Sequence, residues 1–185
     1  MLFKNKIRET ALQYAALICK KDQEIKDFES KYAAIYSPEH FQQERGKLEQ
    51  ERAQVLKSAE MTLNDLADGF KDALIGDDAL EGSRLTDDVK LLTGAFSLTT
   101  ADLEAMYDRA TKDSNRTMQR LVFEYARDHQ VKGFGRVYHT EKDRQEAADL
   151  LLQYARNALV MPEYAALLAD DAQFMKIVPA AIYGN

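Results

Sequence analysis

The chain has 185 residues, of which 45% are hydrophobic and 30% charged, and its formal charge is −6. This length supports one large or two small domains, and a single cysteine excludes an internal disulfide framework and favours a reducing compartment such as the cytoplasm. The acidic balance argues against nucleic-acid binding, and no apolar run reaches the roughly 20 residues of a membrane span.

Apolar residues of the first segment recur alternately four and three positions apart, which predicts a helix with a narrow stripe of the coiled-coil type. The stripe comprises Ile7, Ala11, Tyr14, Ile18, Lys21, Ile25, Phe28, Tyr32 and Ile35. Lys21 interrupts it: either its amine sets the register of the pairing, or its stem lies on the seam and the amine reaches water. The pattern resumes after Pro38 and, after a slip of one position, continues to Ala73, with Gly76 placed to end the second helix.

The stretch "YSPEH" at residues 36–40 predicts a turn between two helices instead of a kink in one. A proline inside a helix costs about 3 kcal/mol, whereas at the first helical position it costs little. Ser37 before it is a good N-cap, and Glu39 suits the helix dipole. Residues 1–76 are therefore predicted to form a long antiparallel helical hairpin, resembling a coiled coil, with its turn at residues 36–39.

Five aromatic or histidine side chains are candidates for partner binding. Tyr36, His40 and Phe41 lie at the predicted turn, where they either close the end of the coil or are displayed to a partner. Phe134 lies between two glycines in "GFG", and it either fills the core or is displayed. Tyr183 belongs to a short apolar tail, which is either docked on the protein or exposed as a binding motif.

Residues 77–98 break the helical pattern and are expected to form an acidic linker with a short helix. Two acidic pairs, at residues 77–78 and 87–88, bracket Gly82. A calcium loop needs alternating oxygen ligands, a central glycine and a closing glutamate at fixed spacing. That spacing is missing, so a solvated linker is favoured over a metal site.

Residues 99–185 are expected to form a compact C-terminal helical bundle. Thr99 and Asp102 have the spacing of a capping box that starts the first of its helices. This helix and the next one could be mistaken for a DNA-reading helix-turn-helix, with Arg116 and Arg120 on the second helix. Ordinary helix packing is favoured, because acidic residues are interspersed among the arginines.

The sequence contains no convincing catalytic constellation, since it lacks a nucleophile elbow, a zinc-binding helix and a Walker motif. His129 and His139 flank the glycine loop, but two separate surface histidines are favoured over a metal or acid–base pair. Cys19 lies beside the apolar stripe, and the favoured interpretation is a small apolar residue instead of a nucleophile. We therefore predict a protein that is no enzyme and has no cofactor or metal.

Residues 91–126, "LLTGAFSLTTADLEAMYDRATKDSNRTMQRLVFEYA", resemble a segment of small helical proteins encoded among the structural genes of phages and prophages of Gram-positive bacteria. The resemblance covers about a fifth of the chain and rests on a capped helix pair. Phage scaffolding proteins are similarly helical and acidic, so it implies a role in virion assembly. The coat-binding end of a scaffold is often basic, whereas this C-terminal part is acidic, and no site residue carries over.

The leading functional expectation is an all-α structural or assembly protein of phage type that acts through protein–protein contacts. Its partners would be a capsid or other virion component and further copies of itself, in the host cytoplasm or in the virion. Two alternatives remain: an acidic soluble regulator that binds and inhibits a host protein, and a helix-turn-helix protein that binds DNA.

Overall fold

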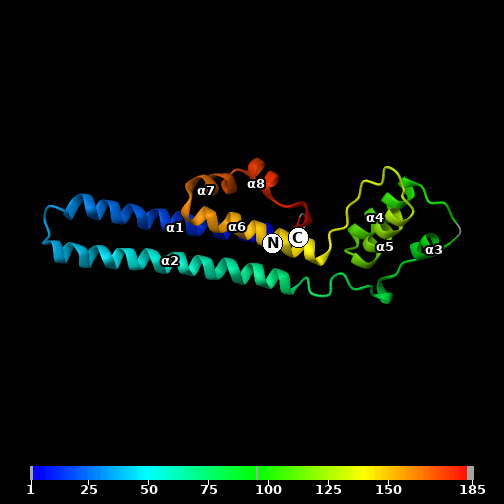
Figure 1. Cartoon of the computed structure of the whole chain (residues 1–185), viewed down its shortest axis with the longest axis horizontal. Coiled ribbons are helices and arrows are strands. Elements are labelled where there is room, and N and C mark those ends of the chain that lie inside the picture. The colour runs from blue at the N-terminus through cyan, green and yellow to red at the C-terminus, as the bar shows by residue number, and fades with distance from the viewer. Residues whose placement is uncertain (1, 95, 183–185) are drawn as a thin grey trace. The chain divides into compact units, whose positions relative to one another are not determined.

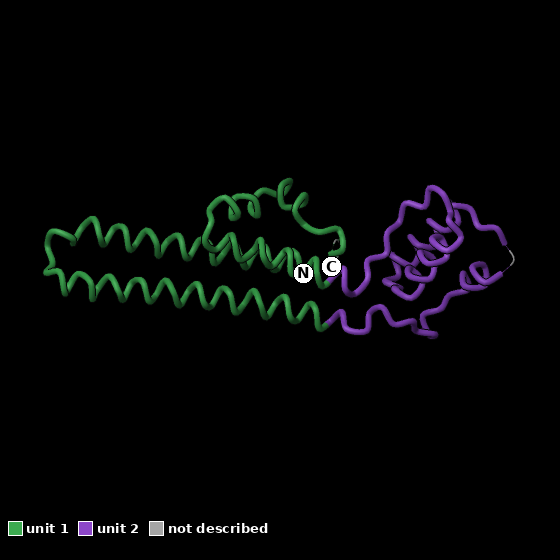
Figure 2. The backbone as a smooth tube through the Cα atoms, viewed as in Figure 1, with its two compact units in different colours: residues 1–72, 145–185 green, residues 73–144 purple. Residues whose placement is uncertain are grey.

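The computed structural model describes residues 2–94 and 96–182, and within these residues it contains α-helices and 3₁₀ turns but no strand (Figure 1). The expected all-α class is therefore confirmed for the described part of the chain. The chain folds as two compact units: unit 1 comprises residues 1–72 and 145–185, and unit 2 comprises residues 73–144 (Figure 2).

Unit 1 begins with two long helices, α1 (Phe3–Tyr32) and α2 (Pro38–Asp72), which lie side by side and antiparallel (Figure 1). The prediction that Pro38 begins a helix is confirmed. The Ser37 hydroxyl lies 3.4 Å from the amide nitrogen of His40, as expected of an N-cap, and the Ser37 carbonyl accepts the first helical hydrogen bond. The helix ends four residues before Gly76, which instead adopts a positive φ of 79° in the following turn.

The second half of unit 1 covers one part of this helix pair. It contains α6 from residue 145 onward, α7, α8 and a final 3₁₀ turn; their bounds are Glu141–Val160, Pro162–Ala169, Asp171–Ile177 and Ala180–Ile182. The apolar faces of these elements pack into one core with α1 and α2. Its fully buried residues include Ile7, Ala11, Ala59, Leu63, Ala67, Ala148, Leu151, Ala155 and Ile182.

The structure divides the predicted bundle of residues 99–185 between the two units. Residues 99–144 belong to unit 2, whereas the residues from 145 onward pack into the core with α1 and α2. The physical reason is that α1 and α2 present apolar faces at Ile7 and Leu63 that a pair of helices leaves open, and α6 closes them with Leu151.

Arg8 of α1 holds the covering helices in place. Its guanidinium donates to the backbone oxygens of Leu168 at 2.5 Å and Ala169 at 2.8 Å, which are carbonyls at the end of α7. It also lies 2.6 Å from a carboxylate oxygen of Asp171 and stands over the ring of Phe174. One cation thus fastens both α7 and α8 to α1.

Unit 2 is built around α4 (Thr100–Lys112) and α5 (Arg116–Asp128), which pack against each other. A 3₁₀ turn (Gly82–Arg84) and a short helix α3 (Asp88–Thr93) precede them. The core of unit 2 consists of Leu103, Met106, Tyr107, Val122 and Ala126, with Phe134 packed against it.

The predicted capping box at the start of α4 is confirmed. The Thr99 hydroxyl accepts from the amide of Asp102, and the Asp102 carboxylate accepts from the amide and the hydroxyl of Thr99. These hydrogen bonds, the side-chain one first, lower the pKa of Asp102. Thr140 and Asp143 form the same arrangement at the start of α6, and hydrogen bonds from Thr140 lower the pKa of Asp143.

We predict that Leu63→Ala lowers the free energy of unfolding by about 2–5 kcal/mol, because Leu63 is fully buried and its removal leaves a cavity. The matched control is Leu48→Ala in the same helix, where the side chain is only half-buried. Its loss should cost less than about 1.5 kcal/mol. Urea unfolding followed by circular dichroism measures both, and equal losses would contradict this account of the core.

We predict that the stability of unit 2 falls at acidic pH partly through Asp102. Its folded pKa lies below its unfolded value, so the stabilisation is present above about pH 4 and is lost as the pH falls through the folded pKa. Asp102→Asn should reduce the difference in stability between pH 7 and pH 3, measured by hydrogen exchange of the α4 amides. Thr99→Ser keeps the hydroxyl and should retain the wild-type difference; an unchanged difference in the Asn variant would refute the assignment.

Candidate functional site

The part of the α1–α2 pair in which no side chain is buried is the first candidate site. We name residues 19–58 the distal arm. No side chain in this stretch is buried, whereas Ile18 before it and Ala59 after it are at most 2% exposed. The stripe residues Ile25, Phe28 and Val55 are therefore only half-buried, and water reaches the seam between the two helices.

Ion pairs bridge the two helices along the distal arm. The amine of Lys21 lies 2.8 Å from Glu24 and 2.7 Å from Glu51 across the seam, and these two hydrogen bonds, that of Glu24 first, raise the pKa of Lys21. Arg52 pairs with Asp22, and Arg45 lies 2.7 Å from Glu29. Lys21 therefore bridges the seam instead of simply extending into water, and complementary charges align α1 with α2 where the apolar contact is weak.

The predicted turn residues come together at the end of the distal arm. Tyr36 stacks on Tyr32 with ring centroids 4.9 Å apart, and His40 lies 4.6 Å from Tyr36. Phe41 stacks on Phe28 at 5.2 Å. Ile35, in the turn itself, is 67% exposed. We name residues 28–41 the tip: its rings pack on one another, and Ile35 remains available to a partner.

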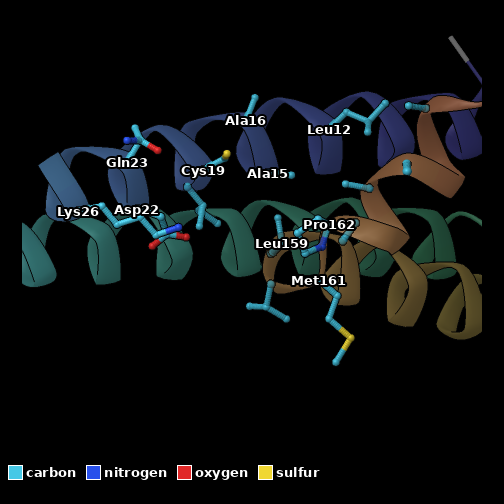
Figure 3. Close-up of a pocket in the computed structure, with 16 residues that line it drawn as sticks. Leu12, Ala15, Ala16, Cys19, Asp22, Gln23, Lys26, Leu159, Met161 and Pro162 are labelled. Atoms are coloured by element: carbon cyan, nitrogen blue, oxygen red, sulfur yellow. The ribbon is translucent and has the colours of Figure 1, made fainter.

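An apolar groove lies where the covered part of unit 1 gives way to the distal arm. It is a cavity of about 510 Å³ between α1 and the junction of α6 with α7 (Figure 3). Small and aliphatic side chains line most of it, and Cys19, Asp22 and Lys26 lie along its α1 side. Its lining residues are Leu12, Ala15, Ala16, Ile18, Cys19, Asp22, Gln23, Lys26, Ala158, Leu159, Val160, Met161, Pro162, Ala165, Ala166 and Ala169.

A second candidate is a charged cluster in unit 2, which corrects the expectation that the acidic pair at residues 77–78 is solvated. Asp77 pairs with Arg116 and with the buried Arg144. Asp78 accepts hydrogen bonds from Tyr138 at 2.7 Å and from the amide of Glu141 at 2.7 Å. The acidic pair thus anchors the segment after α2 to the rest of unit 2.

Burial shapes the titration of this cluster. Burial, followed by the hydrogen bond to Asp78, raises the pKa of Tyr138, and burial together with the nearby Arg116 lowers the pKa of Arg144. Arg116 also stacks on Tyr138 at 4.2 Å and donates to the carbonyl of His139 at 2.6 Å. Two carboxylates and two guanidiniums pair with one another in this cluster, so we interpret it as structural.

The arginines of the helix-turn-helix alternative are engaged within unit 2. Arg116 belongs to the charged cluster, and Arg120 pairs with Glu124 at 2.8 Å and donates to the Asp78 carbonyl at 2.7 Å. Reading a DNA base would require these contacts to break. The sequence prediction did not include ion pairs of Arg116 and Arg120 within unit 2, although the acidic residues at positions 77, 78 and 124 are possible partners for them.

The other sequence candidates have separate surroundings. Phe134 is half-buried against Tyr107, with ring centroids 6.1 Å apart, which favours the core interpretation. His129 stacks on Tyr125 at 4.0 Å. Cys19 is exposed at the groove, whereas a small apolar cysteine is commonly buried. Tyr183 lies outside the described residues, whereas Ile182 just before it is buried.

In the part of the chain that the structure describes, His, Cys, Asp and Glu side chains nowhere form a group of three or more that could hold a metal ion. Of the helices in residues 2–94 and 96–182, none combines the length and apolar character needed to cross a membrane. Comparison with models of protein families, with curated proteins and with solved structures finds no match to this chain.

We predict that Arg116→Ala destabilises unit 2 by at least about 2 kcal/mol, because it leaves Asp77 and Asp78 without a cation that they contact. The control is Arg109→Ala, which removes an exposed pair with Asp88 and should cost less than about 1 kcal/mol. Hydrogen exchange of the α5 amides gives both values. Equal effects would show that the cluster contributes no more than a surface ion pair.

Proposed function

We propose that this chain is a non-enzymatic structural or assembly protein of phage type that acts through protein–protein contacts made by the distal arm. The observation that carries the proposal is the lack of any buried side chain in residues 19–58, beside a fully formed core in the same unit. The resemblance of residues 91–126 to phage and prophage structural proteins supplies the biological setting.

The energetics of the distal arm support a contact surface. Each half-buried stripe residue still exposes apolar area, and burial of such area is favourable by roughly 25 cal/mol per Å². Covering helices achieve this burial for Ile7, Ala11 and Leu63 in the other part of the same helix pair. A partner that lies along the distal arm would do the same for Ile25 and Val55.

The charge pattern supports assembly over the two alternatives. An acidic regulator of a host protein would concentrate negative charge on its binding surface, yet the distal arm has equal numbers of basic and acidic residues, eight of each. A DNA reader would present free arginines, and Arg116 and Arg120 are engaged within unit 2. A neutral, partly apolar surface suits a protein partner.

Shortening the distal arm by one heptad tests the proposal. Residues 22–28 and 46–52 lie opposite each other, since Asp22 pairs with Arg52 and Glu29 with Arg45. Their joint deletion keeps the heptad phase and removes about 10 Å of arm. We expect a folded protein that no longer changes the assembly of the coat protein encoded in the same gene cluster, whereas the full-length chain does.

Sedimentation of the assembly products measures this effect, and Met61→Glu is the matched control because Met61 is exposed outside the distal arm. Circular dichroism and thermal unfolding verify that the shortened chain retains its core. Coat assembly that proceeds identically with and without the full-length chain would contradict the proposal, as would a gene neighbourhood that encodes no virion protein.

A further inference from the structure

We propose that two copies of this chain associate antiparallel through their distal arms, so that the tip of each copy seats Ile35 in the apolar groove of the other. This inference rests on the proposed function and identifies a second copy of the chain as the partner of the distal arm. It joins three features of unit 1: the uncovered seam, the exposed tip and the groove.

The separation of groove and tip along α1 defines one antiparallel overlap. Along α1 the groove is centred near Cys19, and the turn begins at Ala33, 14 positions later. At 1.5 Å per residue this separation is about 21 Å. When two arms overlap antiparallel over this length, each tip lies level with the partner's groove. A two-fold axis makes both ends of the overlap identical, so a single arrangement fills both grooves.

The chemistry of tip and groove is complementary. Alanines and aliphatic side chains line most of the groove, with Asp22, Gln23 and Lys26 along its α1 side, and at about 510 Å³ it has the size of pockets that bind small ligands. Ile35 is 67% exposed and stands beside the packed rings of Tyr32 and Tyr36. An exposed isoleucine beside packed aromatic rings is an apolar anchor that an interface pocket can hold.

Charge selects a second copy over an oppositely charged partner. Residues 19–58 contain eight basic and eight acidic residues, whereas the remainder of the chain carries the whole net charge of −6. Two copies can therefore meet along their neutral arms without net repulsion, while any closer approach of the acidic remainder is opposed. A basic virion protein would instead be attracted to the acidic remainder and would leave the neutral arm uncovered.

The overlap of the two arms also covers the seam between α1 and α2, which water reaches in a single copy. Two paired arms bring four helices together, and their apolar stripes then face a shared interior, as in a four-helix bundle. The ion pairs between Lys21 and Glu51 and between Arg45 and Glu29 flank the seam and already neutralise each other within one copy. The second copy therefore meets these four charges already paired within each arm.

Disulfide formation tests whether the partner is a second copy and whether the two distal arms run antiparallel. The Ile35→Cys variant carries one thiol at position 19 and a second at position 35, which lie 16 positions apart on one chain and are too distant to join within it. In the antiparallel pair, the thiol of Cys19 in one copy meets the introduced tip thiol of the other. Oxidation should therefore give a covalent dimer, and peptide mass mapping should show only the link between positions 19 and 35.

Two control proteins make the result specific. The unmodified chain contains only Cys19, and Ile35→Cys with Cys19→Ser contains only the tip thiol. Like thiols lie about 20 Å apart in the antiparallel pair, far beyond disulfide reach, so both controls should stay uncrosslinked. Links between like positions would overturn the antiparallel arrangement.

Light scattering over a range of concentrations measures the association without cross-linking. Ile35→Glu should weaken self-association at least about tenfold, since it places a charge in the apolar groove, whereas Met61→Glu should leave it within about twofold. A protein that stays monomeric at all concentrations, or equal effects of the two variants, would refute the inference. If such a monomer still alters coat assembly through the arm, the proposed function stands and only the second copy is excluded.

Discussion

The structure of unit 1 depends on how much apolar surface two packed helices can bury without a third helix against them. A narrow stripe on each of two helices gives contacts along one seam, and water approaches the seam from both sides. Where α6, α7 and α8 lie on the pair, Ile7, Ala11 and Leu63 become fully buried. Where those helices end, burial ends with them. The position at which the chain turns from α6 into α7 therefore divides unit 1 into a stable core and a distal arm that remains available for contacts.

Polar contacts perform different tasks in the two units. In the distal arm, exposed pairs such as Lys21 with Glu51 align the helices and contribute little stability, because water screens them. In unit 2, Asp77 and Asp78 lie among Arg116, Arg144 and Tyr138, where partial burial makes each lost partner costly. The same residue types thus act as alignment devices in one unit and as anchors in the other, and the difference is their access to solvent.

Much of the local structure could be predicted from the sequence because its causes lie within a few residues. A proline after a serine starts a helix whatever surrounds it, and a threonine three residues before an aspartate closes its own capping box. The gathering of Tyr36, His40 and Phe41 also followed from their place beside one turn. The candidate groove could not be foreseen, because its walls come from residues 12–26 and 158–169, which no local pattern connects.

The sequence by itself determined the all-α class, the helix start at Pro38 and the cap at Thr99, since these depend on periodicity and on hydrogen bonds between near neighbours. Only the tertiary structure decided that the residues from 145 onward join α1 and α2 instead of α4 and α5, and that residues 77–78 are anchors. The reason is that the hydrophobic effect has no direction: an apolar helix face specifies that it will be covered, but its partner is chosen by shape and by the charges at its edges.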